Sequence, residues 1–279
     1  MYRLERRDIQ KFSFPGGLLL KVTPGESSLR SMEAIQRVLY MMQRYPARFS
    51  FEIWKDDKFS FHFFSSSSNV EGMIKAQLKT IYPQAEVKRS KNPIPNFREG
   101  DYVSAGNLVI SGLELNLRRP EEFHFDPLRH VLEAMNQHDG VSMVQIMFEK
   151  LRKIPEKKKI VLAQKYSEGR GISLPLLRCS VRIVTSSSDG KAARESCEHI
   201  SHTFSAFDSE KCRLFPKLVS FPLIKNSFDI LCNVSDRTFP LFGKDFMISI
   251  AELSSMVHIP VGSGSSGVRY NSPSLQPNW

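Results

Sequence analysis

Basic side chains gather in two runs of the sequence, and these are the groups that neutralise phosphates. The longer run, EKLRKIPEKKKIVLAQK, spans residues 149–165, and the shorter run, KRSK, spans residues 88–91. Such runs contact the phosphates of DNA or of lipid head groups through salt-sensitive interactions. A solvated loop without a ligand explains the same pattern. The candidate phosphate contacts are Lys150, Arg152, Lys153, Lys157, Lys158, Lys159, Lys165, Lys88, Arg89 and Lys91.

The whole chain is basic, with 39 Lys and Arg against 29 Asp and Glu and a formal charge of +10. A positive surplus favours polyanionic partners such as DNA or an anionic membrane surface, but it does not specify a fold. With 41% hydrophobic residues the composition is that of a globular protein. No apolar run approaches the roughly 18 residues that span a bilayer, and the start, MYRLERRDIQK, lacks the apolar core of a signal peptide. We therefore expect a cytoplasmic protein, either free or bound at the inner face of the cell membrane.

Other patterns that could carry chemistry are weaker. Glu198, His199 and His202 share a predicted helix, but no further ligand completes a metal site by spacing, so capping or solvation explains them. GSGSSG at residues 262–267 formally matches a dinucleotide fingerprint, yet no strand precedes it and no helix follows. The four cysteines form no CxxC pair and are expected to be buried reduced thiols. We predict no catalytic, cofactor-binding or metal-binding residue.

A first series of elements positions the shorter basic run. The predicted elements are strand 18–24, helix 28–42, strands 49–54 and 59–64, helix 69–82 and strand 85–90. Ser28 and Asn69 are the expected caps of the two helices. This β-α-β-β-α-β order predicts a ferredoxin-like unit within residues 1–98.

A second, looser series follows at residues 99–260 and includes a basic connector at 152–170. Its predicted elements are strand 107–117, helix 126–137, strands 142–151 and 176–185, helix 189–204 and an irregular stretch to residue 218. Residues 261–279 read as a linker or tail rich in Gly, Ser and Pro. The predicted fold class is α+β: two tandem ferredoxin-like units, each sheet covered by helices on one face.

An aromatic hairpin, FSFEIWKDDKFSFHFF at residues 49–64, raises the question of what its phenylalanines face. Alternation places Phe59, Phe61 and Phe63 on one face of the sheet, and the face that holds Glu52 is the opposite one. Burying an unpaired carboxylate costs several kcal/mol, whereas burying each Phe gains roughly 2 to 3 kcal/mol. We therefore predict that the phenylalanine face is the core and does not stack nucleic-acid bases.

With this organisation the chain resembles the amino-terminal, non-motor region of the conjugative type IV secretion ATPases of the HerA/FtsK-like superfamily. The resemblance spans roughly residues 15 to 275. The segments that carry it are SMEAIQRVLYMM, the aromatic hairpin, IKAQLKTIYPQAEV, DPLRHVLEAMNQHDGVSMVQIMF, LRCSVRIVTSSSDGKAARESCEHISHTFSAFDSEKCRLFPKL and MISIAELSSMVHIP.

The resemblance implies a non-catalytic scaffold that assembles oligomers or membrane complexes, positions a motor and contacts DNA. In such proteins the HIP segment, here His258 to Pro260, leads into a nucleotide-binding motor, whereas this chain ends at Trp279. Neither Gly190-Lys191 nor Gly243-Lys244 lies in a phosphate-binding loop of the G-x-x-x-x-G-K-[ST] type. The chain is expected to be either a fragment of a longer ATPase or a free-standing module beside a separate motor. Its expected partners are that motor, DNA, an anionic membrane and a second copy of itself.

The alternative belongs to a different class of function. A single-stranded nucleic-acid-binding protein could use an exposed sheet face, with Trp54, His62 and Phe64 as the stacking residues.

Overall fold

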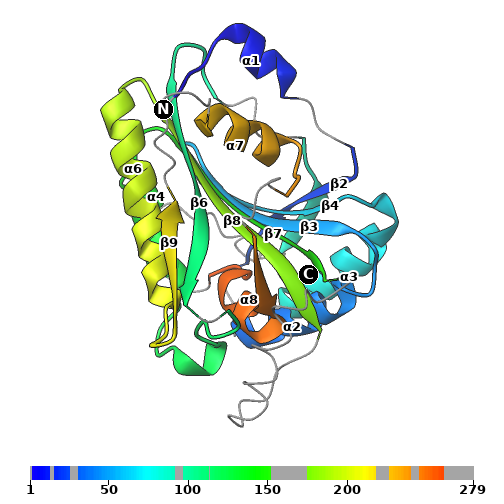
Figure 1. The fold of residues 1–279 in the computed structure, drawn as a ribbon. Coiled ribbons are helices and arrows are strands. Elements are labelled where there is room, and N and C mark those ends of the chain that lie inside the picture. Colours follow the sequence, from blue (N-terminus) through cyan, green and yellow to red (C-terminus); the bar gives the residue numbers. More distant parts are fainter. Residues whose placement is uncertain are drawn as a thin grey trace, which may run out of the picture.

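The computed structural model has an α+β fold, in which the described residues form one ten-stranded antiparallel sheet and seven α-helices (Figure 1). The basic connector beyond Leu151 and the tail from residue 261 lie outside the described residues. The structure describes residues 2–12, 16–25, 31–91, 97–112, 114–151, 175–217, 226–239 and 245–260.

Eight strands form the length of the sheet, four from each half of the chain. The first half pairs in the order β5 (Glu86–Arg89), β2 (Leu18–Thr23), β4 (Phe59–Ser65) and β3 (Arg48–Lys55). The second half pairs in the order β9 (Cys212–Lys217), β6 (Tyr102–Gly112), β8 (Leu176–Ser187) and β7 (Val141–Lys150). Strands β3 and β7 pair antiparallel over the whole length of β3, so the two halves share one continuous sheet. Two short strands, β1 (Tyr2–Arg3) and β10 (Phe246–Ser249), pair with β6 and β8.

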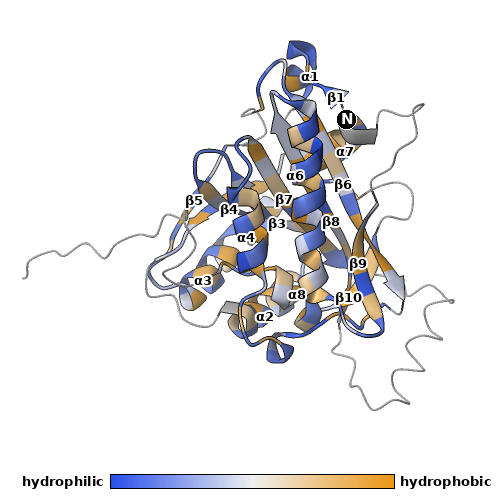
Figure 2. Ribbon diagram, turned by 90° about the vertical axis from the view of Figure 1, so that its left-hand side faces the viewer, coloured by the Kyte–Doolittle hydropathy of each residue, from blue (hydrophilic) through white to orange (hydrophobic). Residues whose placement is uncertain are grey.

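Five helices cover one face of the sheet and enclose the main core. They are α2 (Ser31–Met42), α3 (Glu71–Ile81), α4 (Leu128–Asn136), α6 (Gly190–Thr203) and α8 (Ile250–Met256). Figure 2 shows α4 and α6 in front of the strands. The phenylalanines of β4 that point to this side, Phe59, Phe61 and Phe63, are 6%, 1% and 0% exposed. The prediction that the phenylalanine face is the core is confirmed.

Several helix ends follow the capping signals in the sequence. The Asp189 side chain accepts a hydrogen bond from the Lys191 backbone at the start of α6, and Ser249 and Glu252 form a reciprocal capping box at the start of α8. The predicted Asn69 cap is wrong, because residues Ser68–Val70 form a turn of 3₁₀ helix and α3 begins at Glu71.

The expectation that helices cover only one face is wrong. Helix α7 (Asn226–Ser235) lies on the opposite side, and Figure 1 shows it lying across the strands. Phe12, at the end of α1 (Arg6–Lys11), packs against Phe228 of α7. A second apolar cluster there joins Trp54 of β3 to Leu231 and Val234 of α7. This second layer was missed because its helix is separated from the strands it covers by long stretches of sequence.

The start of the second half also differs from its prediction. The first strand runs over Tyr102–Gly112, instead of 107–117, and ends where Gly112 adopts a φ of +93°. A Cβ at this position would lie 2.3 Å from the Lys211 carbonyl oxygen, so only glycine fits the turn. The stretch predicted to be irregular contains β9, which pairs with the outer edge of β6 and completes the second series of elements.

Candidate functional site: a cationic pocket at the junction of the two halves

The segment between α2 and β3 builds one wall of a pocket. Helix α2 ends at Met42, and the backbone of Gln43, Arg44 and Tyr45 continues its hydrogen bonding for one further turn. Pro46 cannot donate a backbone hydrogen bond and so ends the helical turn. The chain then enters β3 at Arg48, whose backbone N–H donates to Ser66 Oγ at 3.0 Å.

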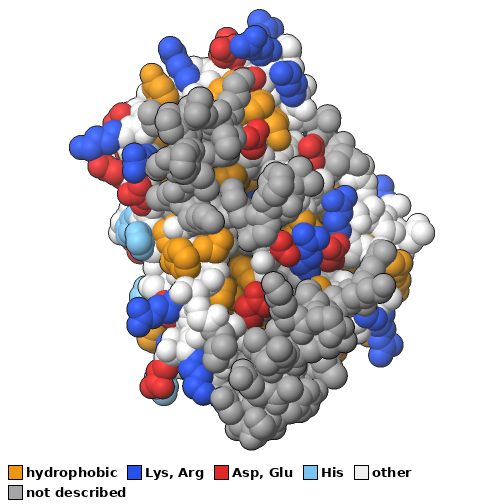
Figure 3. Space-filling model, in the orientation of Figure 1, with side chains coloured by type: hydrophobic (Ala, Val, Ile, Leu, Met, Phe, Trp, Pro, Cys, Tyr) orange, Lys and Arg blue, Asp and Glu red, His pale blue; other side chains and the backbone are white. Residues whose placement is uncertain are grey.

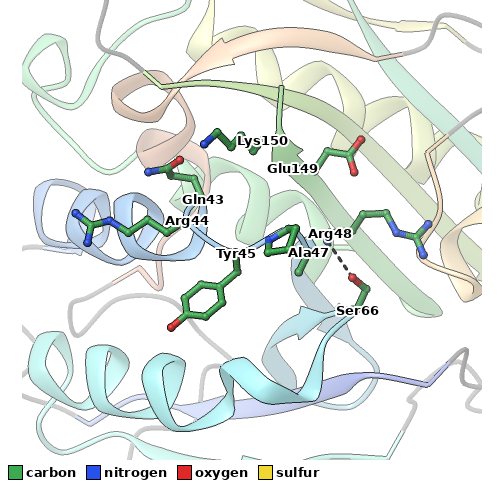
Figure 4. Close-up of a pocket in the computed structure, with 9 residues that line it drawn as sticks. Gln43, Arg44, Tyr45, Ala47, Arg48, Ser66, Glu149 and Lys150 are labelled. Atoms are coloured by element: carbon green, nitrogen blue, oxygen red, sulfur yellow. Dashed lines mark hydrogen bonds between the residues drawn. The ribbon is translucent and has the colours of Figure 1, made fainter. Parts of the chain in front are cut away.

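The pocket has a volume of about 570 Å³ and lies where β3 begins and β7 ends. Its lining comes from residues 43–48, Ser66, Glu149 and Lys150. Arg48 and Glu149 are paired residues of the two strands that join the halves, so the pocket sits at the end of that junction. Figure 4 shows Gln43 and Lys150 on one side and Tyr45 and Ser66 on the other, with the Arg44 and Arg48 side chains pointing apart.

Positive charge dominates this pocket. Among the described residues, no carboxylate pairs with the side chain of Arg44, Arg48 or Lys150. The lining carboxylate, Glu149, is bound by Arg178 at 3.3 Å, and Arg178 also holds Asp245 at 2.7 Å. Four cations thus face two carboxylates, which leaves a local surplus of two positive charges. An anionic group is the ligand that this surplus favours.

One lining residue also has an unmatched polar atom, which is buried away from the open space of the pocket. Gln43 Oε1 is buried and has no hydrogen-bond partner. Unpaired buried acceptors are uncommon in folded proteins because each forfeits its hydrogen bond to water.

Of the predicted phosphate contacts, Lys150 lies in the pocket. The shorter run lies elsewhere: Lys88 and Arg89 belong to β5, at the far edge of the first half. Four strand spacings, about 19 Å, separate β5 from β7, so Lys88 and Arg89 lie apart from Lys150. Arg89 is paired with Glu71, and Lys88 with Glu86, while Lys91 is exposed. The other predicted contacts lie outside the described residues: Arg152, Lys153, Lys157, Lys158, Lys159 and Lys165.

The remaining pocket residues were missed from the sequence. Their only local signal is QRYPAR at residues 43–48, in which two arginines flank a proline after a helix. The approach of Ser66 and Glu149 depends on strand pairing across 18 and about 100 positions of sequence. Figure 3 shows that the basic side chains on one face of the molecule are interspersed with acidic ones and do not form a single patch.

The comparison with known families places this pocket in a defined segment. A family model described as "Domain of unknown function (DUF8128)" matches residues 22–170, which is more than half of the 279-residue chain. The chain belongs to the DUF8128 family. No curated protein matches it. Every residue that lines the pocket lies within the DUF8128 segment, whereas α6, α7 and α8 lie outside it.

A second polar feature of this DUF8128 protein crosses the face of the sheet that lies under α7. Residues paired across neighbouring strands form a continuous row, and its five central members are 0 to 2% exposed. In strand order these five are His62, Glu52, Gln145, Arg182 and Asn107. The row is buried under α7 and the residues that follow it. Trp54, His62 and Phe64 are 3%, 2% and 1% exposed, so the exposed sheet face of the alternative function is absent at these residues.

Glu52 is the second of these five residues and is fully buried. Arg237, from the turn after α7, donates to both of its carboxylate oxygens at 2.8 and 3.1 Å, and Gln145 Nε2 donates at 3.0 Å. Burial alone would raise the pKa of Glu52, but the charge and hydrogen bonds of Arg237 lower it below its usual value. The carboxylate that was expected to be unpaired is therefore an ion-paired anchor for the turn after α7.

The other ionisable members of the row also respond to burial. Burial lowers the pKa of Arg182 to about 9 and that of His62 to about 4. Arg182 donates to Gln145 Oε1 at 3.1 Å and to the Asn233 carbonyl at 2.9 Å. Because most of these contacts are made with α7 or with neighbouring strands, the row ties the second layer to the sheet.

The HIP segment is held by both halves of the chain. His258 Nε2 lies 2.9 Å from Asp126 Oδ1 at the start of α4, and Ile259 N donates to Tyr82 Oη at 3.1 Å at the end of α3. His258 Nδ1 lies 3.2 Å from the Ser254 carbonyl oxygen, so both ring nitrogens face acceptors. Burial alone would raise the pKa of Asp126, but His258 lowers it below its usual value.

The weaker sequence patterns can now be placed. Within the described residues, no group of three or more His, Cys, Asp or Glu side chains could hold a metal ion. His199 and His202 lie on α6, and Glu198 pairs with Arg194. The cysteines are free thiols; three are buried as expected, whereas Cys232 is partly buried, and burial raises the pKa of Cys197 to about 11. In the described part of the chain, none of the helices has the length and apolar character needed to cross a membrane. The GSGSSG segment lies outside that part.

Proposed function

We propose that the DUF8128 protein is built from two ferredoxin-like units fused edge to edge. The first half pairs as β5-β2-β4-β3 and the second as β9-β6-β8-β7, all antiparallel. Numbered within each half, both orders read 4-1-3-2, the order in which a split β-α-β unit of this type pairs. The second strands of the two units then pair with each other as β3 and β7.

We further propose that this pair of units is the non-catalytic scaffold of a type IV secretion or conjugation-type DNA-translocating ATPase. The observation that carries the proposal is the continuous sheet formed through β3 and β7, whose two faces are both covered by helices. Such a body is fixed in shape and acts through its outer surface. The handover segment His258–Pro260 contacts both units, a location suited to transmitting their relative position to a following motor.

The proposed partners follow from this role. They are a motor ATPase domain, on the same polypeptide or on a separate subunit, together with DNA, an anionic membrane surface and further copies of the chain. The proposed place of action is the cytoplasm, at the inner face of the cell membrane. The net charge of +10 supports contact with either polyanion.

Affinity purification of the natural protein from its own cells tests this role. After nuclease treatment and a high-salt wash, which remove DNA bridges and exposed charge contacts, mass spectrometry should find a HerA/FtsK-type motor domain in near-stoichiometric amount. Recovery of the motor domain either on the same polypeptide or on a partner would support the proposal. Recovery of the protein with neither a motor domain nor the membrane fraction would contradict the proposal.

A further inference from the structure

The two ends of the sheet differ in how the chain protects their backbone groups. At the β9 end, the residues whose backbone points away from β6 are Cys212, Leu214 and Pro216. Asp208 Oδ1 accepts from the Leu214 N–H at 2.7 Å. Ser209 N donates to the Cys212 carbonyl at 2.9 Å, and Pro216 has no N–H. These contacts hinder the addition of another strand at this end.

Strand β5 forms the other end of the sheet and lacks such protection (Figure 2). Ser90 N donates to the Leu19 carbonyl of β2 at 2.9 Å. Hydrogen-bonded pairs alternate along an antiparallel ladder, so Lys88 also bonds to β2, whereas Val87 and Arg89 point their N–H and C=O groups outward. No hydrogen bond to another described residue occupies these outward groups. This edge is a template for one further strand.

The surroundings of the β5 edge are basic. Helix α3, strand β5 and the two residues after it carry more cations than carboxylates. The cations are Lys75, Lys79, Lys88, Arg89 and Lys91, and the carboxylates are Glu71 and Glu86, which leaves a surplus of three positive charges. Glu71 is bound by both Lys75 and Arg89, and Lys88 binds Glu86. Within the described residues, Lys79 and Lys91 have no carboxylate partner.

We propose that β5 binds an extended, acidic segment of a partner protein as an additional strand of the sheet. The backbone of that segment pairs with Val87 and Arg89, and its acidic side chains lie on the face that holds Lys88. An apolar side chain of the segment lies beside Val87, which packs against the main core. The inference goes beyond the proposed function, because it names a partner by its chemistry and does not depend on a motor.

Charge and hydrogen bonding favour this partner over two others. A second copy of β5 would bring the same positive surplus against itself, and like charges opposite each other destabilise a strand pair. The phosphates of a nucleic acid would match the lysines, but their oxygens only accept hydrogen bonds and so leave the outward N–H and C=O pattern half unmatched. An acidic strand supplies alternating donors and acceptors together with negative charge.

Fluorescence anisotropy with a defined probe measures the proposed binding. The probe is a fluorescein-labelled peptide of about eight residues in which Val alternates with Glu, and the control peptide has Lys in place of Glu. The natural protein should bind the Glu peptide at about 50 mM salt and bind it more weakly at about 200 mM, because the surplus charge contributes to the affinity. The Lys peptide should not bind. Lack of binding by the Glu peptide, or equal binding of the two peptides, would overturn the proposal.

A backbone variant tests strand addition directly. Val87→Pro removes the outward N–H of β5 and leaves the bonds to β2 in place, a position at which an edge strand tolerates proline. Affinity for the Glu peptide should fall by about 10-fold, the upper end of what one hydrogen bond contributes. The matched variant Val87→Thr keeps the N–H and should bind within about 2-fold of the natural protein. Unchanged affinity in Val87→Pro would overturn the proposal.

A charge variant separates the edge from net charge and does not depend on the folding of Val87→Pro. Lys88→Gln/Lys91→Gln should lower the affinity for the Glu peptide by about 2- to 30-fold, as expected for two cross-strand charge pairs. The control Arg6→Gln/Lys11→Gln removes the same charge from α1, at the opposite end of the sheet. This control should leave the affinity unchanged. Equal losses in the two variants would mean that binding follows net charge and would overturn the proposal.

Two other results would assign the edge to a different partner and overturn the proposal. One is a dimer, detected by sedimentation equilibrium, that Val87→Pro dissociates and the Glu peptide does not. The other is a DNA single strand of about 20 nucleotides that displaces the Glu peptide and binds Val87→Pro as well as the natural protein. Neither result bears on the association with a motor domain, which is judged by its own experiment.

Discussion

The two faces of the sheet are buried in different ways. On the face under α2, α3, α4, α6 and α8, the strands contribute an almost purely apolar surface in which Phe49, Phe51 and Ile53 are 1% or less exposed. On the face under α7, alternate residues of the same strands form a row of polar groups, with Glu52 and Arg182 at 0% exposure. One strand, β3, thus contributes a hydrophobic surface to one layer and a charged anchor to the other.

The contrast between the apolar and the polar face indicates that the two buried faces contribute to the fold in different ways. Apolar burial has no preferred direction, so it stabilises many similar packings and tolerates changes of shape. The Glu52–Arg237 pair is directional, because two hydrogen bonds fix the guanidinium against the carboxylate. A one-residue shift in the pairing of β3 and β7 would move Gln145 away from Glu52 and turn it to the apolar face. The apolar face supplies stability, and the polar face selects one register and one position for α7.

Conservative changes at neighbouring residues should separate the two faces most clearly. Glu52→Gln keeps the shape but leaves Arg237 without its charge partner, so we expect unfolding free energy to fall by about 3–5 kcal/mol. Ile53→Leu keeps the volume on the apolar face and should cost about 1.5 kcal/mol or less. Urea denaturation measures both. Comparable losses in the two variants would remove the distinction between directional and non-directional burial.

The polar face should also make stability depend on pH through His62. Burial and the charges of Lys21 and Arg237 lower its pKa to about 4, against the raising effect of Glu52. Since the unfolded chain binds the proton first, this contribution is complete above about pH 6.5 and is lost as pH falls towards 4. Between about pH 7.5 and pH 5 the loss from this group should be about 2 kcal/mol.

The variant His62→Gln isolates that dependence from other groups, including His138, whose pKa burial also lowers. Urea midpoints measured across the same pH range should decline less steeply in His62→Gln than in the natural protein. Parallel pH profiles for the two proteins would show that His62 does not titrate in this way.

Pairwise coupling gives the smallest expected difference. A double-mutant cycle with Phe51→Leu and Phe63→Leu, whose rings lie 5.1 Å apart, should give a coupling of about 0.5–1.5 kcal/mol. The cycle with Glu52→Gln and Arg237→Gln should give up to about 3 kcal/mol. Both cycles can be read from denaturation midpoints at one pH. A larger coupling on the aromatic side would reverse the assignment of specificity to the polar face.

Local signals predicted the parts of the fold that depend on neighbouring residues. The α+β class, the aromatic hairpin and its buried phenylalanines follow from the alternation of residues within about a dozen positions. The polar residues on the other face of the hairpin were expected to be exposed, because no residue nearby in the sequence could pair with them. Arg237 lies 185 positions after Glu52, and no local pattern joins them.

The pocket also depends on residues that are far apart in the sequence. Lys150 was predicted from charge alone, but its neighbours Arg44, Arg48 and Ser66 are brought to it by the pairing of β3 with β4 and β7. Sequence spacing indicates which residues share a face of one element. It does not indicate which two elements end at the same point, so the site emerges only with the sheet.

The double attachment of the HIP segment has a mechanical consequence. His258 is bound to Asp126 and Ile259 to Tyr82, so tension on the chain beyond residue 260 would load contacts in both halves at once. A segment bound at two points resists detachment by force better than one bound at a single point, because neither attachment carries the full force.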